Sequence, residues 1–249
     1  MISIKSEREI ELMRASGHIN YLAHEEIKKH LKPGVKTIEL DKIAHDFIVS
    51  QDAYPSCLGY EGFPKSICIS INDEVVHGIP GNRKIKNGDI VSIDFCVRYK
   101  GYESDSARTY IIGDVPHDVR DLVENTKEAL KIGLSKVKSG AKIGDISHAI
   151  EEFAHSKGLG VVEDLVGHGI GTNMHEEPDV PNFGESNTGI TLKSGMTIAI
   201  EPMLTLGGKE VCLTDQDDWV IVTMDESPAA HFEHTVLVTE DGYEILTGE

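Results

Sequence analysis

The amino-terminal part of the chain carries two stretches in which apolar side chains recur at helical spacing. Ser6 and Glu9 form a capping box that predicts the start of the first helix, and the Pro-Gly pair at 33–34 predicts its end. A second helix is expected from about Thr37, with its apolar residues along one face. The following segment, 54–64, is rich in glycine and proline and therefore predicts a loop.

Three later stretches have the patterns of β-strands. Residues 66–71 place isoleucine at every second position, which predicts a strand. Residues 90–99 and 102–112 predict two longer strands, separated only by Lys100-Gly101. We therefore expect these two strands to form an antiparallel hairpin with a tight turn.

The second half of the chain repeats the pattern of the first. Residues 31–47 align without a gap onto residues 137–153, and residues 86–94 align onto residues 193–201. The offsets are 106 and 107 positions, so one internal duplication explains both matches. The alternative is that a lysine–glycine turn before a strand is simply common turn chemistry.

Length and composition narrow the classes of protein that fit. A chain of 249 residues is expected to form one α/β (α+β) domain, 1–249, with similar halves of about 1–115 and 116–249. The 42 acidic and 24 basic residues give a formal net charge of −18, which argues against nucleic-acid binding and against attachment to anionic lipid. No apolar run is long enough to span a membrane, and the amino terminus lacks the apolar core of a signal peptide. Since the four cysteines are scattered, a soluble, cytoplasmic protein is expected.

A carboxylate interrupts the apolar strand 90–99. Asp94 lies in its middle, where an uncompensated buried charge would cost several kcal/mol. The hairpin brings Asp94 to the neighbourhood of Asp105, and no nearby lysine or arginine serves as partner. Carboxylates facing each other across adjacent strands, about 5 Å apart, repel, so one stays protonated or a metal ion lies between them. The alternative is that one aspartate points to solvent.

The second half supplies matching polar groups in apolar surroundings. Glu201 is the equivalent of Asp94 in the duplication and lies in an apolar strand that a proline ends. Glu233 is expected at the start of the final strand, and His168 lies between glycines, where backbones pass closely. Taken singly, each has a plain alternative as a surface glutamate or a loop histidine. With Asp105 they favour Mn²⁺, Fe²⁺, Co²⁺ or Zn²⁺, and four carboxylates able to bridge suggest two ions.

The complete motif set resembles the type I methionine aminopeptidases over essentially the whole chain. The residues that carry the resemblance are Asp94, Asp105, His168, Glu201 and Glu233, with the strings VVHGIPG, GHGIG, MHEEP, AIEPM and FEHT. The resemblance implies the pita-bread fold, in which duplicated halves form a curved, largely antiparallel central sheet covered by helices. It also implies that these five residues bind two divalent ions, and that the protein removes the initiator methionine from nascent chains.

The resemblance assigns roles around this metal site. A water that bridges the two ions supplies the hydroxide nucleophile, and Glu201 passes its proton to the leaving amine. His175, in MHEEP, stabilises the developing oxyanion, and His77, in VVHGIPG, contacts the peptide nitrogen after the methionine. The alternative for both histidines is a solvent-facing ring in a loop. Cleavage is expected when the second residue is small and uncharged.

A methionine pocket is implied in the same way. Its expected lining is Cys57, Tyr60, Phe63, Cys68, Met174 and Trp219, whose sulfur and aromatic atoms suit a thioether. The chain departs from the family pattern at Phe63, Met174, Val76 and His231, where Tyr, Phe, Cys and Gln respectively are common. These departures leave the predicted metal ligands unchanged and bear on substrate selectivity.

The chain looks like the short bacterial form of the family. The spacing of the ligands leaves no space for the insertion of the type II enzymes, and a cytoplasmic monomer near the ribosome is expected. One alternative is a prolidase-like peptidase of the same fold, whose additional amino-terminal domain has no room before the helix that starts at residue 6. The other is a metal-free pita-bread binding protein, which should have lost ligands that are all present here.

Overall fold

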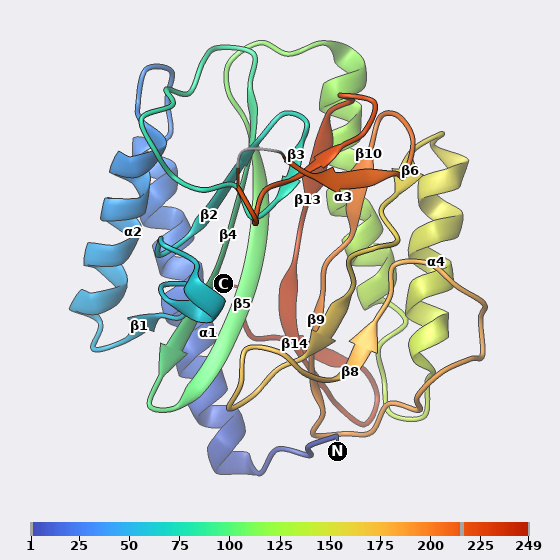
Figure 1. The fold of residues 1–249 in the computed structure, drawn as a ribbon. Helices are drawn as coiled ribbons and strands as arrows, with labels where there is room; N and C mark the ends of the chain where they lie inside the picture. Colours follow the sequence, from blue (N-terminus) through green and yellow to red (C-terminus); the bar gives the residue numbers. More distant parts are fainter. Residues whose placement is uncertain (1, 215–216, 249) are drawn as a thin grey trace.

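The computed structural model describes residues 2–214 and 217–248. Within them, the α-helices lie in two pairs at opposite flanks of the sheets, as Figure 1 shows. The pairs are α1 (Glu7–His30) with α2 (Thr37–Ser50), and α3 (His117–Leu134) with α4 (Ile143–Ser156). A short 3₁₀ helix, η1 (Tyr60–Gly62), follows the first pair. Each half of the chain thus contributes one helix pair.

The two amino-terminal helices begin where the sequence predicts. The backbone nitrogen and Oγ of Ser6 donate hydrogen bonds of 2.7 and 2.6 Å to Oε2 of Glu9, which forms the capping box of α1. Helix α2 starts at Thr37, and the backbone nitrogen of Lys36 donates to Oε2 of Glu39 at 2.8 Å. Local capping and the apolar stripe therefore agree with the tertiary structure.

The strands pair antiparallel in four sheets. In chain order they are β1 (Tyr54–Pro55), β2 (Cys68–Ile71), β3 (Glu74–Val76), β4 (Ile90–Tyr99), β5 (Tyr102–Ile111), β6 (Gly160–Val161), β7 (Gly167–Gly169), β8 (Glu176–Val180), β9 (Thr197–Ile200), β10 (Met203–Thr205), β11 (Val211–Leu213), β12 (Ile221–Thr223), β13 (Ala229–His231), β14 (His234–Val238) and β15 (Tyr243–Ile245). The two larger sheets are β1-β4-β2, with β5 beside β4, and β15-β14-β9-β7-β8. The smaller ones are β13-β10-β6 and β11-β12-β3. The two larger sheets come from different halves of the chain.

The predicted hairpin is confirmed to within one residue, since β4 spans 90–99 and β5 spans 102–111. Two other predictions were only partly right. The segment 54–64 contains β1 and η1 besides loop, and β2 starts at Cys68 rather than at residue 66. All four residues of β2 are buried, so both faces of this strand are covered.

Equivalent contacts recur in the two halves at the offsets that the sequence predicts. Helix α4 is α2 shifted by 106 positions at both ends. The backbone nitrogen of Gly34 donates to the oxygen of Ile85 at 2.8 Å, and that of Gly140 donates to the oxygen of Leu192 at 2.9 Å. Both glycines have a positive φ, of 94° and 87°, which favours glycine. These paired contacts support the duplication.

Each helix pair packs on one of the larger sheets. Ile27 of α1 and Leu40 of α2 belong to a buried cluster with β2 and β4, and Leu122 of α3 and Ile146 of α4 to another with β9 and β14. The halves meet where β5 lies beside the segment that leads into β14. There, the backbone nitrogen of Glu233 donates to the oxygen of Ala107 at 2.9 Å. Among the described residues, no helix is long and apolar enough to span a membrane.

Candidate functional site

The five predicted metal ligands converge where the two halves meet. They are Asp94 on β4, Asp105 on β5, His168 on β7, Glu201 directly after β9 and Glu233 directly before β14. Ligand atoms of Asp105, His168 and Glu233 lie within 4.8 Å of one another. Nε2 of His168 is 3.6 Å from Oε1 of Glu201, and the carboxyl groups of Asp94 and Asp105 contact each other. All five side chains therefore form one cluster.

Three details of the predicted placement are wrong. Glu201 lies directly after β9 rather than inside it, because Pro202 cannot continue the ladder. Asp94 lies opposite Ala107 and Asp105 opposite Cys96, so the two aspartates are diagonal neighbours rather than a directly facing pair. The two-residue turn of the hairpin fixes this register, and the spacing keeps both carboxylates on one face of the sheet. Glu233 does not start the final strand, because β14 begins one residue later and β15 follows it.

The carboxylates are buried without a compensating cation from the protein. Asp105 and Glu233 are 6% and 2% exposed, and Oδ1 of Asp105 and Oε1 of Glu233 have no hydrogen-bond partner among the described residues. No lysine or arginine is among the described residues that line the adjoining cavity of about 500 Å³. Buried carboxylates at this density need protons or a cation, so these residues fit a divalent metal ion.

Burial also changes how these groups ionise in the metal-free protein. It raises the pKa of Asp105 and that of Glu201 to about 8. Burial, and after it the neighbouring carboxylates, raise the pKa values of Asp94 and Glu233 well above the ordinary range. The carboxyl groups of the cluster therefore retain protons in the metal-free protein, and a bound cation would displace these protons.

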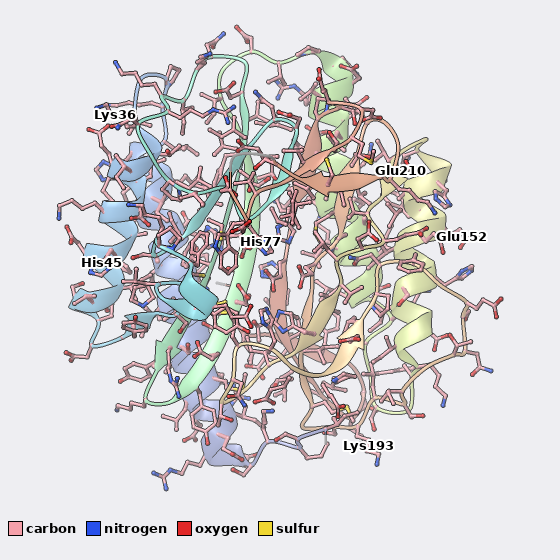
Figure 2. All side chains as sticks on the ribbon, in the orientation of Figure 1. Lys36, His45, His77, Glu152, Lys193 and Glu210 are labelled. Carbon is pink, nitrogen blue, oxygen red and sulfur yellow. The ribbon has the colours of Figure 1, made fainter. Side chains whose placement is uncertain are left out.

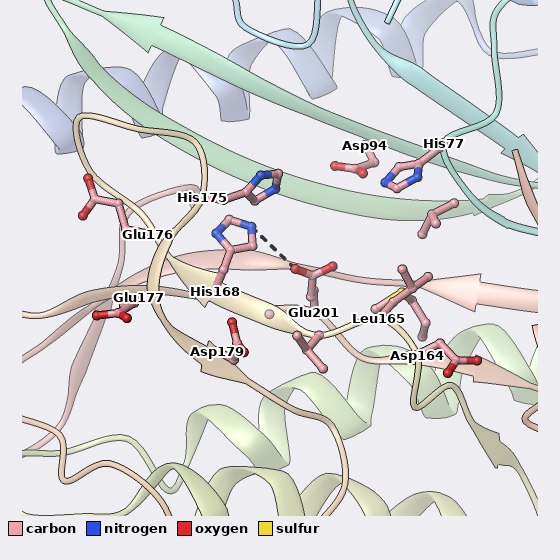
Figure 3. A pocket seen from close by; sticks show the side chains of 14 residues that line it. His77, Asp94, Asp164, Leu165, His168, His175, Glu176, Glu177, Asp179 and Glu201 are labelled. Atoms are coloured by element: carbon pink, nitrogen blue, oxygen red, sulfur yellow. Dashed lines mark ion pairs between the residues drawn. The ribbon is translucent and has the colours of Figure 1, made fainter. Parts of the chain in front are cut away.

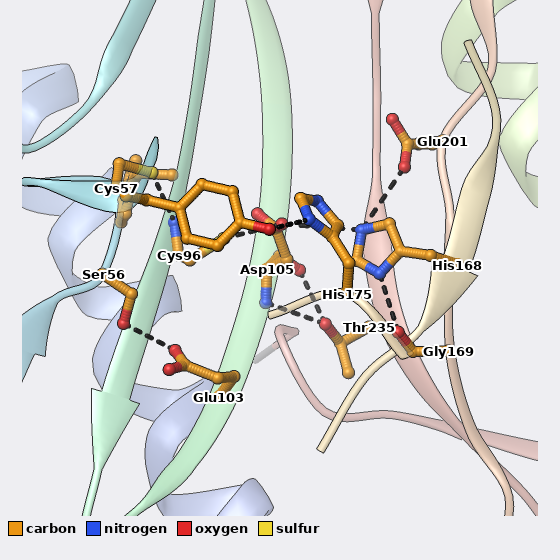
Figure 4. A network of polar contacts seen from close by, with 12 residues as sticks. Ser56, Cys57, Cys96, Glu103, Asp105, His168, Gly169, His175, Glu201 and Thr235 are labelled. Atoms are coloured by element: carbon orange, nitrogen blue, oxygen red, sulfur yellow. Dashed lines mark hydrogen bonds and ion pairs between the residues drawn. The ribbon is translucent and has the colours of Figure 1, made fainter. Parts of the chain in front are cut away.

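His168 presents a lone pair to this cluster. Its Nδ1 donates a hydrogen bond of 2.8 Å to the carbonyl oxygen of Gly169, and burial lowers its pKa to about 4 (Figure 4). The neutral ring then carries its proton on Nδ1, so Nε2 is an acceptor, 3.9 Å from Oδ2 of Asp105 and 3.6 Å from Oε1 of Glu201. Three acceptors that face one another leave a place for a cation.

The glycines on both sides of His168 are required by close backbone contacts. A Cβ at Gly167 would lie 2.4 Å from the oxygen of Ala199, and one at Gly169 would lie 2.2 Å from the oxygen of Glu177. The sequence prediction that backbones pass closely at this motif is thus confirmed.

His77 and His175 flank the cluster, and Figure 3 shows both with Glu201 around one open space. His77 follows β3 in a left-handed conformation, with φ of 61°, a conformation that a non-glycine residue adopts at a cost. In Figure 2 it lies near the middle of the molecule. The ring of His175 is 4.4 Å from that of His168, and its Nδ1 lies 2.9 Å from the hydroxyl of Tyr60. Burial lowers the pKa of His77 and of His175, which favours neutral rings.

An apolar cavity of about 270 Å³ opens beside the cluster. Its lining includes all six residues of the predicted methionine pocket, namely Cys57, Tyr60, Phe63, Cys68, Met174 and Trp219. The rings of Phe63 and Trp219 pack edge to face at 5.2 Å. His77, Asp94 and His175 line both this cavity and the larger one, so the two cavities adjoin at the carboxylate cluster.

Two residues of the site were not assigned a place in it by the sequence. The thiol of Cys96 donates to Oδ2 of Asp105 at 2.7 Å and lines the apolar cavity. The sequence contains a signal for Cys96, because side chains alternate along a strand and residues 94 and 96 therefore lie on the same face. His231 is 1% exposed, with Nε2 3.6 Å from Oε2 of Glu201 and neither ring nitrogen hydrogen-bonded within the described structure. Its contact with Glu201 depends on the pairing of β13 with β10, which no local pattern predicts.

Comparison with known proteins places the chain in a family. A model of metallopeptidase family M24 matches residues 11–240. Methionine aminopeptidase 1 of Bacillus subtilis (strain 168) is 49% identical over 247 residues, which cover 99% of both chains. The crystal structure of methionine aminopeptidase from Rickettsia prowazekii has 44% sequence identity and a TM-score of 0.98, and the match covers 100% of both chains.

A prolidase shares the fold at lower similarity. Prolidase from Pyrococcus furiosus matches with a TM-score of 0.77 and 24% identity, over 99% of this chain and 65% of that chain. This likeness shows the fold alone, whereas the likeness to methionine aminopeptidases extends to sequence and to full length. The predicted α/β pita-bread fold is confirmed. The chain belongs to metallopeptidase family M24 and, within it, to the methionine aminopeptidases.

Proposed function

We propose that the protein removes the amino-terminal methionine from newly made polypeptides when the second residue is small and uncharged. The observation that carries the proposal is the junction of two features. A buried cluster of four carboxylates and a histidine adjoins a cavity lined by sulfur and aromatic groups. The first suits metal-dependent hydrolysis and the second suits a thioether side chain.

Two divalent ions, Co²⁺, Mn²⁺, Fe²⁺ or Zn²⁺, are proposed as the cofactors. Asp94, Asp105, His168, Glu201 and Glu233 would hold them. When bound, such ions lower the pKa of water and polarise a carbonyl oxygen. The unpartnered oxygens of Asp105 and Glu233 support this assignment, because they are buried acceptors that await a cation or a proton.

Glu201, His175 and His77 are the proposed catalytic residues. Glu201 lines the larger cavity and would take a proton from the attacking water and deliver it to the leaving amine. If the hydroxyl of Tyr60 donates to Nδ1 of His175, the neutral ring carries its proton on Nε2. That N–H would stabilise the oxyanion of the scissile carbonyl. His77 would contact the peptide nitrogen that follows the methionine.

The arrangement also accounts for the proposed substrate. A cavity of about 270 Å³, closed by Phe63 and Trp219, favours an unbranched thioether over a branched or charged side chain. The second residue would pass the loop of His77, whose Gly78 has no room for a Cβ because the oxygen of Ile69 would lie 2.1 Å away. This close contact holds the loop of His77 against β2, which supports a fixed wall beside the second residue. We further propose a cytoplasmic monomer that acts near the ribosome.

Peptide hydrolysis tests the proposal. The assay measures release of methionine from Met-Ala-Ser by the metal-free protein with graded Mn²⁺, Co²⁺ and Fe²⁺, and compares Met-Lys-Ser and Leu-Ala-Ser as matched substrates. We expect metal-dependent cleavage of Met-Ala-Ser, with both other peptides slower by about 10²-fold or more. Equal rates for Met-Ala-Ser and Met-Lys-Ser would refute the rule for the second residue. Faster cleavage of Leu-Ala-Ser would refute the methionine pocket.

A further inference from the structure

The loop that carries His175 is fastened to the amino-terminal segment by a buried ion pair. Lys5 lies just before α1, and its Nζ donates to Oε2 of Glu176 at 2.8 Å. The side chains are only 3% and 15% exposed, so water screens the pair little. The contact joins residues 171 positions apart in the sequence.

The other oxygen of Glu176 closes the loop on itself. Oε1 accepts hydrogen bonds from the backbone nitrogen of Thr172 at 2.9 Å and from that of Asn173 at 3.1 Å. Burial acts to raise the pKa of Glu176, but the hydrogen bonds from Lys5 and from these amides outweigh it and lower the pKa. The carboxylate is therefore charged and bonded at both oxygens.

The surrounding backbone is shaped to admit the lysine. A Cβ at Gly171 would lie 2.5 Å from Nζ of Lys5 and 2.7 Å from Oε1 of Glu176, so a larger residue would displace the pair. Lys5 is itself held, since its backbone nitrogen donates to the oxygen of Gly195 at 2.8 Å. The oxygen of Gly171 accepts from the backbone nitrogen of Glu103 at 2.7 Å. Both ends of the ion pair are thus anchored to the rest of the fold.

Stability alone is a poor explanation for this arrangement. Desolvation of a buried lysine and glutamate offsets much of their attraction, and apolar side chains of similar volume often replace such pairs without loss. What distinguishes the pair is its place in the loop. Met174 lines the apolar cavity and His175 lies against His168, and both directly precede Glu176, as Figure 3 shows for His175.

We propose that Lys5 is a positioning residue which, through Glu176 at the start of β8, fixes the segment 171–176 so that His175 and Met174 face the substrate. The inference rests on the proposed function, because it takes the roles of His175 and Met174 from it. Loss of the pair should release the loop without removing a metal ligand. The expected signature is a fall in kcat with normal metal content.

The test compares Lys5→Met and Glu176→Gln with the double variant and with Arg14→Met. Arg14 is the matched control, because it also ties the amino-terminal region to a distant carboxylate, Glu244, at 2.7 Å, but in an exposed pair that lines neither cavity. Four quantities are measured: kcat for Met-Ala-Ser at saturating metal, KM for the same peptide, bound metal per chain, and amide hydrogen exchange of residues 171–176.

We expect each single variant to lower kcat by about 10- to 100-fold, since a misplacement of about 1 Å can have that effect. Metal content should stay unchanged, and exchange in 171–176 should rise. The double variant should be no slower than the slower single variant, because both changes break one contact. Arg14→Met should retain wild-type kcat and wild-type exchange.

A kcat for Lys5→Met within about twofold of wild type, unchanged exchange in the loop, or a loss of metal that parallels the loss of kcat would each overturn the proposal. If Lys5→Met does not fold, Glu176→Gln tests the proposal. This substitution keeps the shape of the side chain and one acceptor oxygen but removes the negative charge. Failure of the wild-type protein to release methionine would refute the proposed function instead, and hydrogen exchange would then show separately whether the pair orders the loop.

Discussion

Binding of a divalent cation to the metal-free protein is expected to release protons, because the carboxylates proposed as its ligands must ionise to bind it. Burial raises the pKa of Asp105 and of Glu201 to about 8. At pH 7 these groups are therefore mostly protonated in the metal-free protein. The pKa values of Asp94 and Glu233 are also raised well above the ordinary range, so these groups hold protons as well. We expect release of about two protons or more per chain at pH 7.

Calorimetry measures this number directly. The protein is titrated with Mn²⁺ at pH 7 in buffers of different ionisation enthalpy, and the slope of the observed heat against that enthalpy gives the protons released. The number should fall as the pH rises through about 8, because the free carboxyl groups then ionise without the metal. Arg14→Met, which lies outside both cavities, is the matched control and should release the same number of protons as the wild type. Release of less than about one proton, or a number independent of pH, would refute the argument from burial.

The same protonation makes the stability of the metal-free protein depend on pH. The ordinary pKa of Asp105 is 3.8, and burial raises it to about 8 in the folded protein. Between about pH 4 and about pH 8 the folded state therefore keeps a proton on Asp105 that the unfolded state has lost. The free energy of unfolding therefore falls as the pH rises from about 4 to about 8. Thermal melting with chelator from pH 5 to 9 checks the sign. A melting temperature that rises over this range would contradict it.

Three further changes probe separate parts of the molecule. His175→Ala should lower kcat by about 10²-fold or more with unchanged metal content, and loss of metal instead would make His175 a ligand. Asp94→Asn should lose tight metal binding, measured by calorimetry, while its circular dichroism stays native; full activity at low metal would argue against its role. Gly17→Ala should destabilise by about 1–3 kcal/mol in urea unfolding, because its Cβ would lie 2.1 Å from the oxygen of Leu246. Unchanged stability would mean that α1 shifts without cost.

Much of the fold could be predicted because its signals are local. The start of α1 depends on Ser6 and Glu9, which are three residues apart, and the β4–β5 hairpin depends on one tight turn. The short strands could not be predicted in this way, since β1 exists only through its pairing with β4. Two residues of strand carry too little pattern to be distinguished from a loop.

The site was predictable where polar residues stand in apolar strands. Asp94 stands out on this ground, because burial makes its carboxylate costly. His168 stands out through its flanking glycines, which indicate a close approach of backbones. The contact of Lys5 with Glu176 has no such signal, since both are ordinary surface residue types and 171 positions separate them. The contact of His231 with Glu201 could not be predicted either, because it depends on the pairing of β13 with β10. Both contacts form only when the tertiary structure brings together residues that are distant in the sequence.

The duplication relates one pair of the proposed ligands and leaves the rest of the site asymmetric. Asp94 and Glu201 are equivalent residues, one from each half. The hairpin brings the next ligand of the first half after only a short turn, whereas β10 to β13 intervene before Glu233. That longer segment contains Trp219, which packs on Phe63 of the first half, and its strand β12 pairs with β3. On the proposed function, the segment that the second half adds before Glu233 thus supplies one wall of the methionine pocket, through Trp219.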